Sequence, residues 1–417
     1  MPEPAAARET AAPRAPAPGG GRPLPAGWRW VRLGEVCSIV ARQVDPKLPE
    51  YGALPHVSGE DIEGGRGRIG PLKTAAEDGM TSGKYLFEAG DVLYSKLRPY
   101  LRKAAVASCQ GVCSADMYPI RADASQLDST YLAWLFISDD FTAYADSESR
   151  RARMPKLNRE QLFAWETPLP PLPEQKRIAA VLAEQMAAVD RARAAAEARL
   201  EAARALPAAY LRAVFESPEA RGWPRRRLGD VGDVVNGFGF AEHLQGRHDL
   251  PYPFVKVSDM NADGAESVVR MAANTVDDQM LKTLRARTYP AGTVIFPKVG
   301  GALLTNKKRV LGTEATFDNN VMGIVPKSVD SSWLFRWMQT VDLRTLANTQ
   351  ALPSIRQSEV AELEVPLPDR GEQERALGLL TERLEGAACA QQAAEAELAA
   401  INALPAALLR RAFSGEL

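Results

Sequence analysis

Apolar side chains recur every seven residues in two separate stretches of this chain. Each repeat carries two apolar rows, a spacing that is typical of helices packed in a coiled coil. Both stretches run for about four heptads, and many of their core positions are alanine, which lets two helix backbones approach closely. The core positions predicted in this way include Leu182, Val189, Arg193, Leu200, Leu380, Leu384, Gln391, Leu398 and Ile401.

The two heptad stretches belong to a longer internal repeat. Residues 154–215 align with residues 352–413 without a gap and are identical at 25 of 62 positions. A Pro-Leu-Pro step precedes each predicted helix. A fainter likeness joins "WRWVRLGEV" from Trp28 to "WPRRRLGDV" from Trp223. The order is therefore globular unit, helix, globular unit, helix, as an internal duplication produces.

The direction of the two helices follows from this order. The first helix carries the chain from one globular unit to the other and the second must return, so the pair is expected to be antiparallel. If Leu182 lies level with Ile401, Arg193 and Gln391 meet near the midpoint, where a polar pair would fix the register. Two alternatives remain: these polar side chains point to solvent, or each helix packs only on its own unit.

The predicted fold class is α+β, with two similar mixed α/β domains separated by two long antiparallel coiled-coil helices and related by a pseudo-twofold duplication. The globular units, hereafter head 1 and head 2, each mix strand-like and helix-like patterns, such as "GTVIFPKVGG" from Gly292 and "SSWLFRWMQTVDLRTL" from Ser331. The predicted boundaries are a disordered tail over 1–24, head 1 over 25–167, the central helix over 168–216, head 2 over 217–365 and the C-terminal helix over 366–417.

Each head contains one basic loop bounded by strand patterns. Glycines and aromatic residues lie beside the charges, as expected where a loop approaches phosphates and base edges. A charged run is more often a solvated surface, and only the recurrence of the loop in both heads favours DNA contact. The candidate DNA-binding residues are Lys96, Arg98, Arg102 and Lys103 in "YSKLRPYLRKA", and Lys298, Lys307, Lys308 and Arg309 in "PKVGGALLTNKKR".

Composition limits the possible classes of protein. At 417 residues the chain is long enough for two or three domains with apolar cores. The formal net charge of −1 argues against a free-standing nucleic-acid-binding protein, which would be distinctly basic. Any DNA binding must therefore depend on local basic patches or on the charge of a partner.

Cysteine and histidine are too sparse for a disulfide framework or a zinc site. The chain has three histidines and four cysteines, Cys37, Cys109, Cys113 and Cys389. No apolar run approaches the roughly 20 residues that a membrane helix requires, and the Ala- and Pro-rich start is unlike a signal peptide. We therefore expect a cytoplasmic protein without a metal, a cofactor of its own or a membrane anchor.

Known catalytic motifs fail on inspection. "GRGRIG" from Gly65 satisfies G-x-G-x-x-G, but no apolar strand leads into it and no apolar helix follows, so a loop is expected rather than a dinucleotide site. "GMTSGKY" from Gly79 has the wrong spacing for a phosphate-binding loop. The sequence supports no active site.

Three segments together resemble a known family. "PLPPLPEQKRIAAVL" from Pro168, "LLRRAFSGEL" from Leu408 and "GDVLYSKLRPY" from Gly90 are similar to the specificity (S) subunit of type I restriction-modification systems. The resemblance covers nearly all of the chain after Leu24. "PLPDRGEQER" from Pro366 departs from the family pattern, because Asp369 to Gly371 replace a more usual apolar stretch.

The resemblance implies a function that agrees with the duplication. In that family two target-recognition domains each read one half of a bipartite, non-palindromic site in double-stranded DNA, and the paired helices set the gap. The S subunit is not catalytic. It binds two methyltransferase (M) subunits, restriction (R) subunits complete the complex, and these partners bind S-adenosylmethionine, magnesium and ATP. Two other readings remain open: the specificity subunit of a system whose partner fuses nuclease and methyltransferase, and a scaffold that binds only protein.

Overall fold

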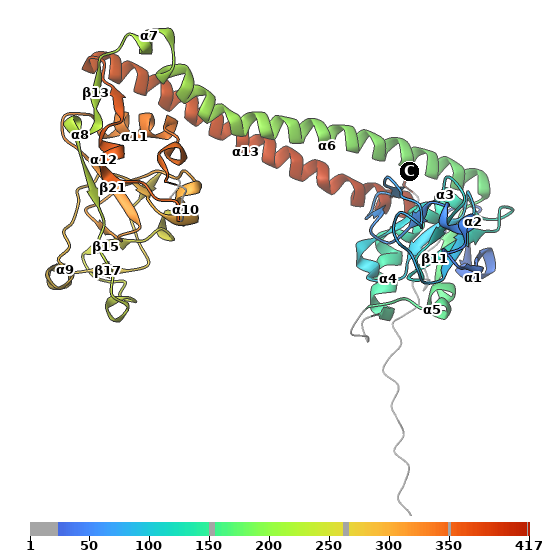
Figure 1. Cartoon of the computed structure of the whole chain (residues 1–417). Helices are drawn as coiled ribbons and strands as arrows, with labels where there is room; N and C mark the ends of the chain where they lie inside the picture. The colour runs from blue at the N-terminus through green and yellow to red at the C-terminus, as the bar shows by residue number, and fades with distance from the viewer. Residues whose placement is uncertain (1–23, 150–154, 262–266, 349–351, 415) are drawn as a thin grey trace, which may run out of the picture. The chain divides into compact units, whose positions relative to one another are not determined.

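Two long helices are the largest elements of the computed structural model, which describes residues 24–149, 155–261, 267–348, 352–414 and 416–417. Helix α6 (Leu172–Phe215) has 44 residues and helix α13 (Arg370–Ser414) has 45 (Figure 1). The tail predicted over 1–24 lies outside the described residues, apart from Leu24. Within the described part of the chain, no helix is both long and apolar enough to cross a bilayer.

The chain forms two compact units, and each contains parts of both long helices. The first unit consists of residues 1–197 and 396–417, and the second of residues 198–395. The buried core of the first unit includes Leu409 and Ala412 of α13, together with Leu182 of α6. Head 1 is therefore completed by the C-terminal end of the chain.

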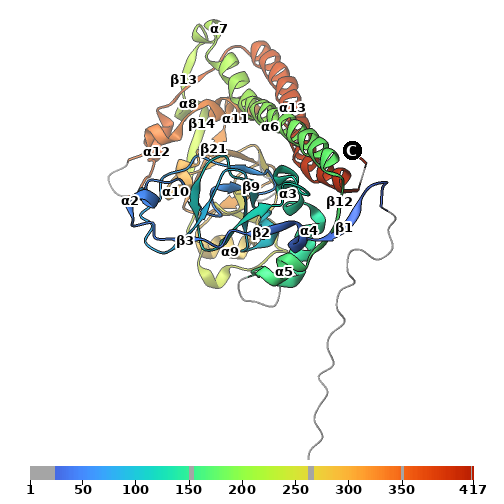
Figure 2. The same ribbon diagram turned by 90° about the vertical axis from the view of Figure 1, so that its right-hand side faces the viewer.

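Head 1 contains two four-stranded sheets. Helix α3 (Ser129–Phe136) contacts the sheet that contains β8, and in Figure 2 it lies beside β9. Tyr94, Phe136 and Phe141 form an aromatic cluster in this core. In hydrogen-bonded order, the first sheet is β2 (Cys37–Ile39), β11 (Met117–Ala122), β8 (Val92–Ser95) and β9 (Ala104–Val106), and the second is β3 (Gln43–Val44), β7 (Lys84–Phe87), β10 (Gly111–Cys113) and β4 (His56–Val57).

Head 2 repeats the first of these sheets. The first four strands of its larger sheet have the same hydrogen-bonded order, relative to their order in the sequence, as β2, β11, β8 and β9 of head 1. Helix α11 (Ser331–Thr340) follows β21 in the sequence, as α3 follows β11. The predicted duplication is confirmed. The larger sheet is β14 (Gly232–Asn236), β21 (Val321–Pro326), β18 (Val294–Pro297), β19 (Arg309–Leu311) and β16 (Val268–Val269), and the smaller is β17 (Thr275–Val276), β15 (Tyr252–Val255) and β20 (Thr316–Phe317).

Short helices and turns join these strands. Head 1 contains α1 (Leu33–Val36), α2 (Pro49–Gly52), the two-stranded hairpin β5 (Ile62–Glu63) and β6 (Arg68–Ile69), η1 (Pro99–Leu101), α4 (Asp139–Ser149) and α5 (Arg159–Ala164). The second unit contains α7 (Pro218–Arg221), α8 (Leu228–Val231), η2 (Glu242–Leu244), η3 (Asp259–Asn261), α9 (Asp278–Leu284), α10 (Gly300–Leu304), η4 (Leu343–Leu346) and α12 (Gln357–Ala361).

The repeated Pro-Leu-Pro step closes each head. In head 1 its first residues form the end of β12 (Glu166–Leu169), which pairs antiparallel with the opening strand β1 (Arg29–Arg32). In head 2 β22 (Glu364–Pro366) pairs in the same way with β13 (Arg225–Arg227). The first and last strands of each head thus lie together where the long helix begins.

The repeated Glu-Gln step ties each long helix to its head. The side chain of Gln175 is fully buried, and its Nε2 donates to the carbonyls of Pro170 and Gln126 at 2.9 and 2.8 Å. Its Oε1 accepts the backbone N–H of Asp128 at 2.9 Å. The equivalent Gln373 keeps the bond to its own Pro-Leu-Pro segment, the carbonyl of Pro368, at 2.8 Å. The glutamine of the Glu-Gln step therefore attaches the start of each long helix to the segment before it by hydrogen bonds.

The start of α13 is also capped where the sequence departs from the family pattern. Asp369 Oδ1 accepts the backbone N–H of Glu372 at 3.0 Å, and its carbonyl accepts the N–H of Gln373. An aspartate at this position satisfies an N–H group that a helix start leaves free. The substitution thus gives the helix a polar cap.

Within each unit α6 and α13 run side by side in opposite directions (Figures 1 and 2). The predicted register needs correction. In the second unit Arg383 lies over the ring of Tyr210 at 5.6 Å, whereas the level predicted from Leu182 and Ile401 would place Gln373 there. Arg204 of α6 also pairs with Glu395 of α13 at 3.2 Å, so these contacts place the register about ten to sixteen residues from the prediction. A seam composed largely of alanine has few distinctive side chains, and so it specifies register weakly.

The predicted seam positions differ in burial. Leu182, Val189, Leu200 and Leu380 are buried, whereas Leu384, Gln391, Leu398 and Ile401 are partly buried. The prediction that Arg193 lies in the core of the helix pair was wrong, because its side chain is 46% exposed and its Nε donates to Glu197 at 2.9 Å on the same helix. A guanidinium gains more from water and a neighbouring carboxylate than from an apolar seam.

Candidate nucleic-acid interface

The same backbone arrangement presents one lysine in each head. In head 1 strand β8 is followed by Lys96, whose carbonyl accepts the N–H of Leu157 at 3.0 Å, and Arg98 N–H donates to the carbonyl of Pro155 at 2.9 Å. In head 2 strand β18 is followed by Lys298, whose carbonyl accepts the N–H of Ile355 at 3.0 Å. In both heads, backbone hydrogen bonds therefore hold the segment before α5 or α12 against the residues that follow β8 or β18.

Two cations lie near one tyrosine ring in head 1, and a third acts electrostatically on one of them. Lys96 is buried, its Nζ donates to the carbonyl of Ala115, and it lies 5.0 Å from the ring centre of Tyr118. The guanidinium of Arg159 lies 6.0 Å from the same ring. Burial lowers the pKa of Lys96, and the positive charges of Lys156 and Arg159 lower it further against the opposing effect of Asp116. The side chains of Lys156 and Arg159 are exposed. This end of head 1 is therefore a local positive surface.

Arg98 and Tyr100 project from the turn next to that surface. Arg98 has a left-handed backbone with φ of 50°, and its side chain is exposed. Tyr100, in the 3-10 turn η1, is 51% exposed. Among the described residues the guanidinium of Arg98 has no hydrogen-bond or ion-pair partner. A left-handed conformation is unfavourable for arginine, so the turn holds this side chain outward at some conformational cost.

The other two predicted cations of head 1 have partners inside the first unit. Arg102 Nη1 bonds to Asp139 at 2.6 Å, and Arg410 of α13 bonds to the same carboxylate at 3.2 Å. Lys103 Nζ donates to the carbonyl of Gly59. These contacts hold the loop and the C-terminal helix on head 1.

In head 2 a chain of polar bonds surrounds Lys298. Its Nζ donates to Asn236 Oδ1 at 2.8 Å, and Asn236 Nδ2 donates to Gln357 Oε1 at 2.8 Å. Gln357 Nε2 in turn donates to the carbonyl of Val234. Burial lowers the pKa of Lys298, and the charge of Asp318 partly opposes this effect. The two amides are therefore held in fixed orientations.

These amides line a shallow cavity of about 270 Å³. Arg285 and Arg287 border it, and both side chains are exposed. Arg285 has a left-handed backbone with φ of 50°, like Arg98. The guanidinium of Arg287 lies 5.3 Å from the ring centre of Tyr289. Amides, guanidinium groups and an aromatic ring are the side chains that read base edges and bind phosphates.

The remaining predicted cations of head 2 hold their own loop. Lys307 Nζ donates to Asn261 Oδ1, and Lys308 Nζ donates to Asn306 Oδ1 and the carbonyl of Val341. Lys308 is buried, and burial lowers its pKa to about 8. Arg309 Nη1 donates to the carbonyl of Lys308 at 2.8 Å.

Sequence reasoning missed several side chains of this candidate surface. They are Lys156 and Arg159 in head 1, and Asn236, Arg285, Arg287 and Gln357 in head 2. A signal was present for some of them, because Pro155 and Pro353 are identical positions of the internal repeat. Because the repeat aligns these two prolines, the basic or amide residues that follow them could have been added to the candidate DNA-binding residues.

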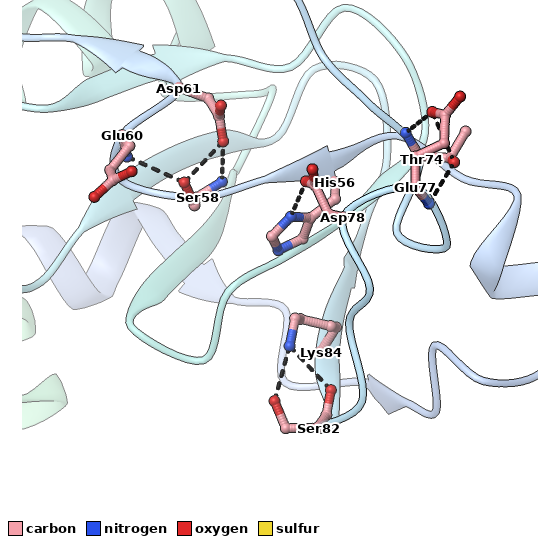
Figure 3. Close-up of polar contacts among 9 residues, drawn as sticks. All are labelled: His56, Ser58, Glu60, Asp61, Thr74, Glu77, Asp78, Ser82 and Lys84. Carbon is pink, nitrogen blue, oxygen red and sulfur yellow. Dashed lines mark hydrogen bonds and ion pairs between the residues drawn. The ribbon is translucent and has the colours of Figure 1, made fainter.

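Strand β4 of head 1 and the segment between it and β7 contain histidine, serine and aspartate, but not as a catalytic triad (Figure 3). His56 Nδ1 lies 2.9 Å from Asp78 Oδ2, whereas Ser58 Oγ donates to Asp61 at 2.8 Å. Within the described residues His56 Nε2 has no hydrogen-bond partner. Nor do three histidine, cysteine, aspartate or glutamate side chains gather as a metal site in the described part of the chain. These polar pairs brace the loop.

The duplicated α+β heads and the paired long helices define the structural class, and comparison with known proteins gives the family. The type I restriction modification DNA specificity domain matches residues 25–194 and 220–383. The two matches cover well over half of the chain, which therefore belongs to this family.

Individual relatives agree with the family. The type I restriction enzyme EcoDI specificity subunit of Escherichia coli is 37% identical over 155 residues, which are 37% of this chain and 34% of that protein. The matched region thus spans about a third of that relative's length.

Two solved structures have the same fold. A chain from work on complex assembly and conformational transition of the type I R-M system has a TM-score of 0.79 at 23% identity, over 95% of this chain and 100% of that chain. The HsdS subunit from Thermoanaerobacter tengcongensis has a TM-score of 0.66 at 23% identity, over 95% and 99%. At this identity the likeness is one of fold.

Proposed function

We propose that this chain is the DNA-specificity subunit of a type I restriction-modification complex, and that each head reads one half of a bipartite, non-palindromic site in double-stranded DNA. The observation that carries the proposal is the duplicated strand end that presents Lys96 in head 1 and Lys298 in head 2, beside exposed guanidinium groups. Family membership supplies the class of ligand.

The two surfaces suit base reading in different ways. Arg98, held outward by its turn, can bond in bidentate fashion to guanine, and the amides of Asn236 and Gln357 can bond to adenine. Each such pair contributes roughly 1–3 kcal/mol of discrimination against a wrong base. Because the side chains differ between the heads, the two half-sites differ in sequence. Lys156 and Arg159 bind phosphate in this scheme.

The chain acts without catalysis of its own in the cytoplasm. It binds two methyltransferase (M) subunits and, through the complex, restriction (R) subunits. S-adenosylmethionine, magnesium and ATP belong to those partners. The net charge of −1 supports this division, because the partners then supply much of the salt-sensitive attraction to phosphates while the heads supply base discrimination.

Selection of randomised DNA by the complex with methyltransferase tests the assignment of one half-site to each head. We expect wild type to enrich two short motifs at one separation. Arg98→Ala should relax base preference in one motif and Asn236→Ala in the other, because each change removes contacts from a single head. Sequencing of the bound DNA gives the preference at each position.

Matched controls remove exposed arginines from the strands that open each head. Arg32 pairs with Glu166 and Arg227 with Glu362. These glutamates follow the C-terminal ends of α5 and α12, whereas Arg159 and Gln357 are the first residues of those helices. Arg32→Ala and Arg227→Ala should enrich the wild-type motifs. Loss of preference in both halves with either test variant would contradict the one-head, one-half assignment.

A further inference from the structure

The hairpin β5–β6 joins head 1 to the long helix α6 by two ion pairs on one carboxylate. Arg66 Nη1 lies 3.1 Å from Asp190 Oδ1, and Arg68 Nη1 lies 3.0 Å from Asp190 Oδ2. Arg68 Nη2 also bonds to Glu63 across the hairpin at 2.8 Å. The side chain of Arg66 is 12% exposed and that of Asp190 is 25% exposed. Both oxygens of Asp190 are therefore engaged by head 1.

This hairpin is the G-x-G-x-x-G segment that failed as a dinucleotide site. Gly65 and Gly67 have φ of 71° and 66°, which the tight turn requires. A Cβ at Gly67 would lie 3.4 Å from the ring of Trp134, and one at Gly64 would lie 2.5 Å from the carbonyl oxygen of Leu101. The glycines let the turn lie close to the head while both arginines reach α6.

The ion pairs lie one helical turn beyond the apolar contact between head 1 and α6. The buried core of the first unit includes Ile178, Leu182 and Met186 of α6. Asp190 follows Met186 by four residues, which corresponds to about 6 Å along a helix. A cavity of about 280 Å³, lined by residues that include Arg66, Trp134, Met186 and Asp190, lies between the hairpin and the helix. Side-chain packing is therefore incomplete at this level, and the ion pairs bridge the space.

We propose that Arg66, Arg68 and Asp190 form a clamp that fixes the tilt of head 1 on α6 and thereby restricts which separation of the two DNA half-sites the chain accepts. The ion pairs extend the contact of head 1 along α6 by one turn beyond Met186, and a longer line of contacts opposes rocking of the head more strongly. The position of α13 equivalent to Asp190 in the internal repeat is Ala388, so the carboxylate of the clamp is not duplicated. This inference rests on the proposed function.

The test measures acceptance of altered spacing. The complex of the full chain with methyltransferase is given DNA duplexes carrying the two wild-type motifs at the preferred separation and at separations one base pair shorter and longer. Asp190→Ala should bind the preferred duplex as wild type does, and should lose about fivefold of the discrimination against the altered spacings, which is the scale that partly exposed ion pairs supply. Asp190→Glu should restore most of it.

Two comparisons separate a positioning role from a structural one. Glu197→Ala removes an ion pair on the same helix that does not involve head 1, and it should keep wild-type discrimination. Raising the salt concentration should weaken spacing discrimination in wild type but not in Asp190→Ala, because screening acts on the clamp. Thermal unfolding of each variant checks that all are folded.

The outcomes distinguish the clamp from the function on which it rests. If wild type shows no preferred motif or separation, the proposed function fails. If wild type is selective and Asp190→Ala discriminates between spacings equally well, the clamp proposal is overturned while the function stands. Equal loss of discrimination in Glu197→Ala would also overturn it, because the effect would then belong to the helix as a whole.

Discussion

Individual cations in the two basic loops have different tasks. Lys96 in head 1 and Lys308 in head 2 are buried and bond to backbone carbonyls, whereas Arg98, two residues after Lys96, is exposed. The charges themselves were evident from the sequence, but which of them reach solvent depends on tertiary contacts with residues such as Ala115 and Val341. Neighbours distant in the chain decide burial, and a charge pattern alone does not report them.

The lowered pKa of Lys308 predicts a pH effect on stability. Its pKa is about 8 in the folded chain and about 10.4 when unfolded. Between these two pKa values the unfolded chain binds more protons than the folded chain, so this lysine makes the free energy of unfolding rise with pH. Below about pH 8 the lysine is charged in both states, and the full cost of burying its charge then lowers the free energy of unfolding. Relative to Lys308→Met, wild type should gain about 1–2 kcal/mol between pH 7.5 and 9.5.

Urea unfolding of both proteins at the two pH values measures this difference. Comparing the two proteins cancels the titration of other groups, including the buried Cys37 and Cys113, whose pKa burial raises to about 12. An equal change in the free energy of unfolding of wild type and variant would show that the charge of Lys308 does not destabilise the folded state.

At the scale of elements, the sequence was most informative where periodicity is strong. The heptads predicted both long helices. The predicted starts at residues 168 and 366 were wrong by four residues, because these prolines belong to strands β12 and β22 and the helices begin at Leu172 and Arg370. The register was wrong because alanines at positions such as Ala196 and Ala394 are interchangeable along a seam. The hairpin of Arg66 and Arg68 was expected as a loop, since strands of two residues give no pattern to detect.

The buried Gln175 predicts unequal consequences for the two copies of the Glu-Gln step. Gln175→Ala leaves three backbone groups, at Pro170, Gln126 and Asp128, without their partner, and should lower the free energy of unfolding by about 2–4 kcal/mol. Gln373→Ala removes one bond, to Pro368, and should cost about 1 kcal/mol. Chemical denaturation of both variants provides the comparison, and equal losses would argue against this account of the attachment.

At the scale of the whole molecule, duplication explains why one chain can carry two different readers. The sheet order β2, β11, β8, β9 recurs as β14, β21, β18, β19, so the framework is shared. The side chains at the candidate surfaces differ, as the exposed Arg98 in one head and the partly buried Asn236 in the other illustrate. Framework residues follow from the repeat, whereas the side chains that we propose to read bases differ between the heads, and the repeat does not identify them.

Methylation mapping of a host genome with and without this gene, in cells that also carry the methyltransferase gene, tests whether each head reads one half-site. We expect a methylated motif with two unlike halves separated by unspecified bases, and we expect it to disappear when the gene is deleted. A continuous or palindromic motif, or a bipartite motif that persists after deletion, would contradict the reading of one half-site by each head.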